Sequence, residues 1–267
     1  RKIRNTFRFL LGNLRDKKIN FNLNSKEIRK WPELERFMLH QIFKLNENFE
    51  KYFKLYNFHK LYKELFHFCS QDLSAFYFDI RKDTLYCDKI NSPKRKICIN
   101  LLSLILDLLL KWLAPILSFT TEEIFRIINQ KKNSSIHLQA FSNIPKKWCN
   151  NKLAEKWNEI FYVRQVCNAA IEEKRSSKEL GSSLEADLEI YLSDQYLKLV
   201  KNIDLSEFCI TSSAVTRPLD IKRENLFQME NIEGIKVLVN KAKGNKCPRC
   251  WKIVRGICQR CEEATSA

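Results

Sequence analysis

Two closely spaced pairs of cysteines near the C-terminus constrain the fold of this chain more than any other feature. Cys247 and Cys250 form one Cys-x2-Cys pair, Cys258 and Cys261 form a second, and seven residues separate the two pairs. Each pair can supply two thiolates from one tight turn, and this spacing is typical of a tetrahedral Zn²⁺ site. The segment has too few apolar residues to fold by burial alone, whereas structural zinc contributes about 10–16 kcal/mol in finger peptides. We therefore predict one structural zinc ion; two disulfides or four unrelated core cysteines are the alternatives.

The remaining cysteines show no repeating spacing and lie in apolar or mixed surroundings. Isolated cysteines in such surroundings are typical of reduced, buried thiols, and they favour a cytoplasmic protein. They are Cys69, Cys87, Cys98, Cys149, Cys167 and Cys209.

The net charge of +16 is concentrated at the two ends of the chain. Residues 1–30 hold ten Lys or Arg against two acids, and residues 236–260 hold eight against none, while residues 31–235 are nearly balanced, with 29 against 27. Basic patches attract polyanions through counterion release, and nucleic acids are the commonest partner of this kind. A surface that is generally rich in lysine is the alternative explanation.

The first 145 residues show helical periodicity, and the chain has only 5 Gly and 6 Pro, which favours long helices. We predict an antiparallel helical bundle over residues 1–145, with a polar connector over residues 15–30. The first helix carries Arg1, Lys2, Arg4 and Arg8 beside its apolar face, an arrangement suited to a phosphate backbone. The predicted bundle helices cover residues 1–14, 32–56, 58–80, 92–112 and 122–129.

The helix over residues 92–112 is apolar enough to raise the question of a membrane span. Asp107 and Lys111 interrupt its apolar run, and Pro115 follows it closely. Charged residues inside a span are costly, so we predict a buried bundle helix and no membrane association.

The pattern changes after Pro145. A long helix over residues 150–174 is followed by three segments that alternate like strands, with a helix-like stretch at residues 195–201 between the first two. We predict a small α/β subdomain over residues 146–240 and the zinc-binding element over residues 241–267. The predicted strands cover residues 184–192, 208–215 and 235–239.

A catalytic constellation is missing from the sequence. The four histidines lie singly, the five glycines form no phosphate-binding loop, and the acids show no isolated pair suited to acid–base work. We predict no catalytic residues within these 267 residues.

The two Cys-x2-Cys segments are called here the first and the second knuckle. The aromatic and basic residues in and beside them are the stronger functional candidates. Trp251 follows the second cysteine directly, Arg249 lies between the first two, and Lys252 and Arg255 follow. A rigid knuckle could present the indole for base stacking, which is worth about 1–3 kcal/mol per base. The alternative is a Trp that covers the zinc site or the adjoining strand.

Five segments of the chain resemble bacterial isoleucyl-tRNA synthetases, in the same order as in that family. The bundle segments alone would also suit valyl- or leucyl-tRNA synthetases, so the last two segments determine the choice. The segments are residues 4–14 (RNTFRFLLGNL), 72–86 (DLSAFYFDIRKDTLY), 113–124 (LAPILSFTTEEI), 181–186 (GSSLEA) and 247–251 (CPRCW).

The resemblance implies the C-terminal part of such a synthetase, with a class I anticodon-binding bundle, a junction and a zinc-bearing tip. The complete enzyme would ligate isoleucine to tRNA(Ile) with ATP, as a cytoplasmic monomer. The catalytic signatures of that enzyme are absent here. The segment Lys174-Arg-Ser-Ser-Lys178 resembles one of them only superficially. We therefore expect tRNA binding without activity from this chain, with ATP binding confined to the missing domain. Arg249 and Trp251 are expected at the anticodon bases.

Other expectations remain open from the sequence alone. The chain begins with Arg1 and shows no signal peptide, so we expect a fragment of a longer protein. The alternative is a free-standing zinc protein that binds RNA or DNA. A further possibility is that the zinc-binding element is purely structural and that other parts of the protein contact the tRNA.

Overall fold

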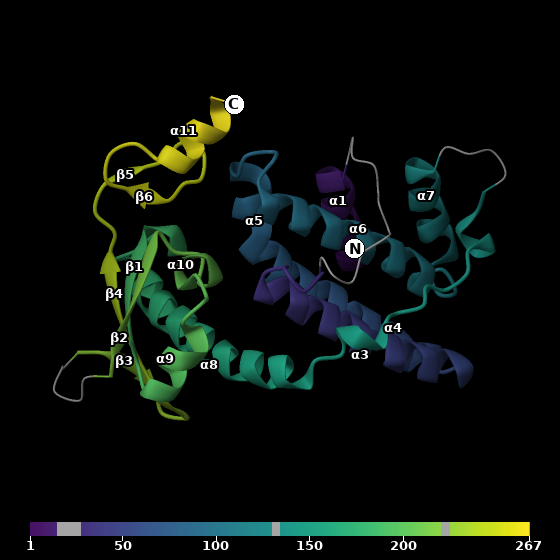
Figure 1. Ribbon diagram of the computed structural model, residues 1–267, viewed down its shortest axis with the longest axis horizontal. Helices are drawn as coiled ribbons and strands as arrows, with labels where there is room; N and C mark the ends of the chain where they lie inside the picture. Colours follow the sequence, from purple (N-terminus) through teal and green to yellow (C-terminus); the bar gives the residue numbers. More distant parts are fainter. Residues whose placement is uncertain (15–27, 130–133, 220–224, 267) are drawn as a thin grey trace. The chain divides into compact units, whose positions relative to one another are not determined.

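The computed structural model describes residues 1–14, 28–129, 134–219 and 225–266 (Figure 1). The described chain is mainly helical, with a small sheet and a cluster of cysteines near the C-terminus, and this much of the predicted fold class is confirmed. Most of the predicted connector over residues 15–30 lies outside the described residues. The chain divides into two compact units. Unit 1 comprises residues 1–85 and 90–151, and unit 2 comprises residues 86–89 and 152–267.

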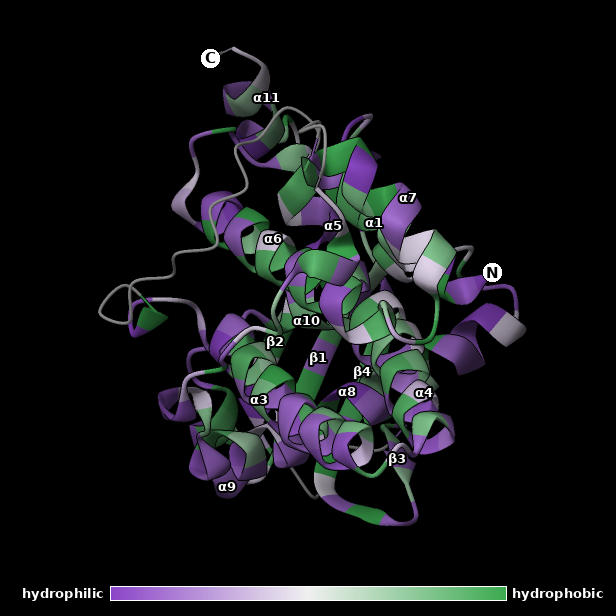
Figure 2. Ribbon diagram, turned by 90° about the vertical axis from the view of Figure 1, so that its right-hand side faces the viewer, coloured by the Kyte–Doolittle hydropathy of each residue, from purple (hydrophilic) through white to green (hydrophobic). Residues whose placement is uncertain are grey.

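Unit 1 is built from helices whose ends have local chemical causes. Pro32 precedes α3, Asn57 accepts a hydrogen bond from the backbone N–H of Lys60 at the start of α4, and Pro93 occupies the first turn of α6. Figure 2 shows the polar and apolar stripes that alternate along α3 and α4. The elements are α1 (Lys2–Leu14), α3 (Glu33–Lys54), α4 (Phe58–His67), the π-helix η1 (Phe68–Tyr77), α5 (Phe78–Cys87), α6 (Pro93–Leu113), α7 (Ser118–Ile128), and the 3₁₀ turns η2 (Ile136–Leu138) and η3 (Lys146–Trp148).

The apolar helix α6 is the central element of unit 1. Its side chains are buried around most of its circumference, and it contacts α1, α3, α4 and α7. Its two charged residues are accommodated because the Lys111 ammonium lies 2.8 Å from the Asp107 carboxylate, and both groups contact the Ser142 hydroxyl. Within the described ranges, none of the helices is both long enough and apolar enough to cross a bilayer.

The predicted helix over residues 58–80 continues to Cys87 and contains a π-helical segment. Within it, the Ser74 hydroxyl donates to the carbonyl of Cys69 at 2.7 Å, and Thr6 of α1 contacts the same carbonyl at 3.4 Å. Widened turns leave backbone carbonyls to other donors, and these two hydroxyls supply them here. The apolar spacing of the sequence did not reveal this segment.

A buried ion pair joins α3 to α5. The Arg81 guanidinium donates to both Glu35 carboxylate oxygens, at 2.6 Å and 2.9 Å, and the Tyr77 hydroxyl donates to the first of them at 3.1 Å. Glu35 is fully buried and Arg81 is 3% exposed. The two charges therefore satisfy each other in a site that solvent does not reach.

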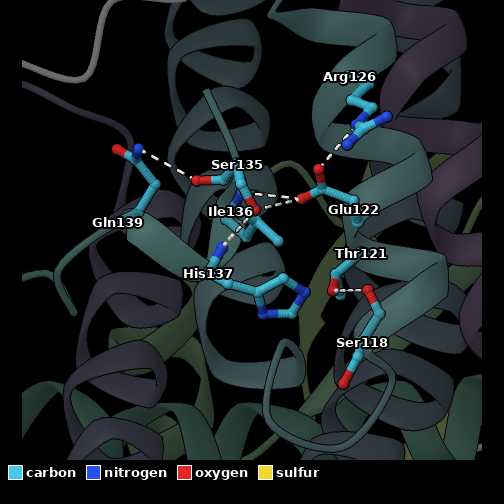
Figure 3. Close-up of polar contacts among 8 residues, drawn as sticks. All are labelled: Ser118, Thr121, Glu122, Arg126, Ser135, Ile136, His137 and Gln139. Atoms are coloured by element: carbon cyan, nitrogen blue, oxygen red, sulfur yellow. Dashed lines mark hydrogen bonds and ion pairs between the residues drawn. The ribbon is translucent and has the colours of Figure 1, made fainter. Parts of the chain in front are cut away.

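Glu122 fixes the segment after α7. Its carboxylate accepts hydrogen bonds from Arg126, from the Ser135 hydroxyl and from the backbone N–H of Ile136, at 2.7 Å, 2.8 Å and 3.0 Å (Figure 3). These bonds, with that of Arg126 the largest cause, lower the pKa of Glu122. The chain that enters η2 is held against α7 in this way.

Unit 2 combines a long helix with a four-stranded sheet of order β2-β1-β4-β3. Strand β1 pairs in parallel with β2, with Asp187 opposite Ser213, and antiparallel with β4, with Leu188 opposite Val239. The helix α8 packs on α10, one of the two short helices between β1 and β2, through an edge contact of Trp157 with Phe208. Their ring centroids are 5.6 Å apart. The elements are α8 (Asn151–Ser176), the 3₁₀ turn η4 (Ser183–Glu185), β1 (Ala186–Leu192), α9 (Asp194–Val200), α10 (Leu205–Phe208), β2 (Ser213–Pro218), β3 (Phe227–Met229), β4 (Ile232–Lys241), β5 (Asn245–Lys246), β6 (Ile253–Val254) and α11 (Gln259–Thr265).

The predicted strand over residues 208–215 is wrong in its first half. The Asp204 carboxylate accepts hydrogen bonds from the backbone N–H groups of Ser206 and Glu207, and so starts the short helix α10 that ends at Phe208. Strand β2 begins only at Ser213. Phe208 and Cys209 are buried, but they are buried at the end of a helical turn and not in a strand.

Candidate metal centre and basic residues

The first knuckle is the turn of a short hairpin. Strands β5 and β6 pair antiparallel, and within the turn the backbone N–H of Cys247 donates to the carbonyl of Lys252 at 2.9 Å. The N–H of Trp251 donates to the carbonyl of Cys247 at 3.0 Å, with Trp251 in the left-handed region at φ 64°. The turn therefore directs the thiols of Cys247 and Cys250 to the same side.

Gly244 makes the approach to this hairpin possible. Its φ of 138° is one that residues with side chains rarely adopt, and a Cβ at this position would overlap the carbonyl of Val254 on the opposite strand. The close approach of the two strands at their start therefore requires glycine.

The second knuckle is the start of α11. Cys258 lies just before the helix, and its carbonyl accepts the backbone N–H of Cys261 at 2.9 Å. Three of the four thiols belong to buried residues, and Cys258 is half-buried. The short helical turn thus presents the second pair of thiols to the first.

The four sulfur atoms lie within 4.8 Å of one another, so the predicted grouping of these cysteines is confirmed. The Cys250 and Cys258 sulfurs are 3.8 Å apart, and a tetrahedral ion with Zn–S bonds of about 2.3 Å separates its ligand sulfurs by about 3.8 Å. The four residues could therefore hold one metal ion, with no coordination position left for a substrate. Metal sites with four protein ligands are typically structural in other proteins.

Local hydrogen bonds prepare one of these thiols for a cation. Burial is the largest single influence and would raise the pKa of Cys247, but hydrogen bonds from the backbone of Cys250 and Arg249 and from the thiols of Cys250 and Cys261 together lower it to about 7. Burial raises the pKa of Cys250, Cys258 and Cys261. A bound divalent metal would remove those protons, since coordinating thiols are deprotonated.

Arg249 contacts the C-terminal end of α5, whose last residues belong to unit 2. Its guanidinium donates to the backbone carbonyls of Cys87 and Tyr86, the latter at 3.1 Å. The carbonyls of a last helical turn have no partner within the helix and favour a cation. The last turn of α5 contains no basic residue, so Arg249 supplies that cation from 162 residues further along the chain.

Further contacts hold the same segment against the knuckles. The Arg260 guanidinium lies 3.4 Å from the Asp88 carboxylate, and the Lys89 ammonium lies 3.0 Å from the Glu263 carboxylate. The buried thiol of Cys87 packs with the metal-site cysteines. In the sequence, Cys87 is one of the cysteines without a repeating spacing. The opposite charges of the residues in the two ion pairs are the only sign in the sequence that residues 86–89 contact the knuckles.

The other basic residues of the knuckles face outward to different degrees. Trp251 is 60% exposed, and the Lys246 ammonium lies 5.5 Å from its ring centroid. Arg255 is exposed and Lys252 is half-buried. The indole is therefore accessible, with the Lys246 ammonium beside its ring.

The predicted basic residues of the first helix are exposed on α1. Arg1 and Arg8 face solvent, Lys2 lies 5.7 Å from the ring centroid of Phe66, and Arg4 forms an exposed ion pair with Glu123 at 3.2 Å. The opposite face of α1 is buried through residues that include Phe7. Of the four cations, Arg4 alone is seen with an acid among the described residues, and that pair is open to solvent.

Comparison with known proteins gives the family to which the helical part of this chain belongs. A family model described as the anticodon-binding domain of tRNA ligase matches residues 35–192. The chain therefore belongs to the family of anticodon-binding domains of tRNA ligases.

The relatives narrow this class to one kind of ligase. The chain is 54% identical over 260 residues to the isoleucine–tRNA ligase of Pelagibacter ubique, a match that covers 97% of this chain and 27% of that ligase. The isoleucine–tRNA ligase of Bartonella quintana is 38% identical (96% and 26%), and that of Bradyrhizobium diazoefficiens is 41% identical (95% and 25%). The chain spans about a quarter of the length of these ligases and is similar to their C-terminal part.

Proposed function

We propose that these residues recognise the anticodon of tRNA(Ile) as the C-terminal part of an isoleucine–tRNA ligase. The complete enzyme would join isoleucine to tRNA(Ile) with ATP, and this part would supply binding without catalysis. One observation carries the proposal: in a chain of the anticodon-binding family, Trp251 beside a four-cysteine site is 60% exposed, and the Lys246 ammonium lies next to its ring. A cytoplasmic, monomeric parent enzyme and an antiparallel class I bundle in unit 1 belong to the same proposal.

The proposed metal is one Zn²⁺, bound by Cys247, Cys250, Cys258 and Cys261. Four thiolates with these separations suit zinc, and the closed set of ligands gives it a structural role. The ion would fix the knuckle turn and, with it, the direction of the Trp251 side chain.

The two candidate contact residues have different roles in this proposal. Trp251 is accessible for stacking on an unpaired base, which is worth about 1–3 kcal/mol per base. Arg249 is committed to the end of α5 through its guanidinium. Its contribution to tRNA binding would therefore include holding the knuckle in place, whereas Lys252, Arg255 and the cations of α1 would contact phosphates.

Filter binding of the chain to tRNA(Ile), and to the same tRNA with an exchanged anticodon, tests the proposal. We expect the native chain to prefer the matched anticodon, and Trp251→Ala to weaken that binding by about 5- to 150-fold, the equivalent of about 1–3 kcal/mol. Tyr162→Ala is the matched control, because it removes an aromatic residue of unit 2 that is 43% exposed on α8. Equal affinity for both tRNAs, with no loss in the Trp251 variant, would contradict the anticodon role.

A further inference from the structure

A second surface combines exposed aromatic residues with lysines, far along the sequence from the knuckles. It is the corner between α3 and α4, residues 51–63, called here the α3–α4 corner. This segment contains four lysines and no Asp or Glu. The apolar periodicity of the sequence predicted that this segment belongs to the helical bundle, but it indicated no binding role for it.

The corner holds large apolar side chains in solvent. Tyr56 is 80% exposed and Leu55 is 67% exposed, while Phe58 and Tyr62 are each 37% exposed. Tyr56 has a left-handed backbone with φ 53°, a conformation that is strained for a residue with a side chain. Its N–H donates to the carbonyl of Phe53, and the N–H of Asn57 donates to that of Tyr52. The backbone hydrogen bonds therefore define the turn in which the Tyr56 side chain is exposed.

The lysines of the two helices converge beside one ring. The ammonium groups of Lys51 from α3 and Lys60 from α4 lie 5.8 Å and 5.9 Å from the ring centroid of Tyr52. The nearest acids along the chain, Glu50 and Glu64, accept hydrogen bonds from Asn46 and Asn48. The two lysines therefore place positive charge on both sides of the turn between the helices, and an external anion would be attracted to it.

The chemistry of the corner favours RNA over a protein partner. All four of its cations are lysines, and protein interfaces are depleted in Lys and enriched in Arg. Lysines beside exposed aromatic rings are typical of surfaces that bind single-stranded nucleic acid, where the cations contact phosphates and the rings stack on bases.

We propose that the α3–α4 corner binds the backbone of the same tRNA. Lys51, Lys54, Lys60 and Lys63 contact phosphates, and Tyr56 stacks on an unpaired base or ribose. This inference rests on the proposed function for the identity of the RNA, but it concerns a contact that does not read the anticodon. Phosphate contacts carry no sequence information of their own.

The test measures how salt and anticodon affect the binding of corner variants. The chain with Lys60→Ala and Lys63→Ala is compared with the chain carrying Lys146→Ala and Lys147→Ala, which removes the same charge from exposed residues of the same unit. For the corner variant we expect about tenfold or greater loss of affinity. We also expect a shallower dependence of log K on log salt, by about 0.7–0.9 for each phosphate that the variant no longer neutralises. The loss should be equal for matched and anticodon-swapped tRNA(Ile).

Tyr56 provides a second variant that leaves the charge unchanged. Tyr56→Phe keeps the ring and should bind as the native chain does, whereas Tyr56→Ala should lose about 5- to 150-fold in affinity. Because the side chain is exposed, circular dichroism and the melting temperature should be unchanged in both variants.

The outcomes separate this inference from the proposed function. If the native chain discriminates between anticodons, and the corner variants lose no more affinity than the Lys146 and Lys147 control, the corner proposal alone is overturned. That is also the result expected if the corner docks on another protein segment. If the corner variants lose affinity but the native chain does not discriminate, the anticodon role fails and the corner contact stands.

Discussion

Asp72 shows how a single residue acquires an unusual property from its surroundings. It lies in the π-helical segment, where burial raises its pKa to about 6 against the opposing influence of His67, and Glu64 adds to the rise. An acid with a raised pKa keeps its proton in the folded chain after the unfolded chain has lost it. The free energy of unfolding therefore falls as pH rises from about 4 to about 6, and it stays lowered above that range.

Replacement of Asp72 by Asn should remove this cost. At pH 4 we expect little change in the free energy of unfolding. At pH 7 we expect a stabilisation that approaches 3 kcal/mol at most, since one pKa unit corresponds to about 1.4 kcal/mol. Urea unfolding of both chains between pH 4 and pH 7 measures the difference.

Asp79→Asn is the control for this experiment. It removes a carboxylate from an exposed ion pair with Lys82, which should change stability by less than about 1 kcal/mol. If the free energies of unfolding of the native and Asp72→Asn chains differ by the same amount at pH 4 and pH 7, burial of ionised Asp72 does not cost stability.

At the scale of the elements, charged side chains join segments that are distant in the sequence. The Glu35 and Arg81 pair connects α3 to α5, and Arg249 connects the first knuckle to the last turn of α5. The two contacts differ in environment, because the first is buried and the second is half-buried. The buried pair should therefore be the more costly to break.

Removal of one member of the buried pair should destabilise unit 1 strongly. Arg81→Ala leaves the Glu35 carboxylate buried without its cation, at a cost of about 3–5 kcal/mol in the free energy of unfolding. A variant with Met at positions 35 and 81 and Phe at position 77 removes every charged or hydroxyl group of the cluster. It should recover most of that loss, because apolar replacements of a complete buried pair are often neutral. Equal instability of the two variants in thermal unfolding would count against this account.

At the scale of the whole molecule, the helices of unit 1 and the four-cysteine tip of unit 2 (residues 241–266) should depend on different forces. Unit 1 buries large apolar side chains such as Trp112, Phe7 and Met38. In the described part of the chain, Val254 is the one apolar residue other than cysteine that packs on the four-cysteine cluster. Metal binding should therefore control folding of the tip alone.

Removal of the metal by a chelator should unfold the tip and leave the helical core folded. We expect one zinc ion per native chain by elemental analysis. After chelation, the four ligand thiols should become reactive, with little loss of ellipticity at 222 nm, because the apolar core of unit 1 needs no metal. In Cys258→Ser, the tip should be unfolded and its remaining ligand thiols reactive even without chelator. A collapse of the helical signal on chelation, or a native chain without metal, would refute the assignment.

The sequence by itself determined the features that depend on neighbours along the chain. The apolar spacing predicted the helix at α6, and the Cys-x2-Cys spacing predicted the grouping of four thiols, because turns of this length bring nearby residues together. The family resemblance followed from segments of the same local kind, including residues 247–251.

Only the tertiary structure decided which distant residues meet. The prediction that Arg249 contacts a base stays a prediction, but the structure adds partners that the sequence did not reveal, the carbonyls of Tyr86 and Cys87. Carbonyls at a helix end lack partners within the helix, and side-chain identity gives no sign of this. Glu35 and Arg81 looked like ordinary charges on two helix faces, and packing made them a buried pair. Apolar spacing is local, whereas the partner of a charge depends on what the fold brings beside it.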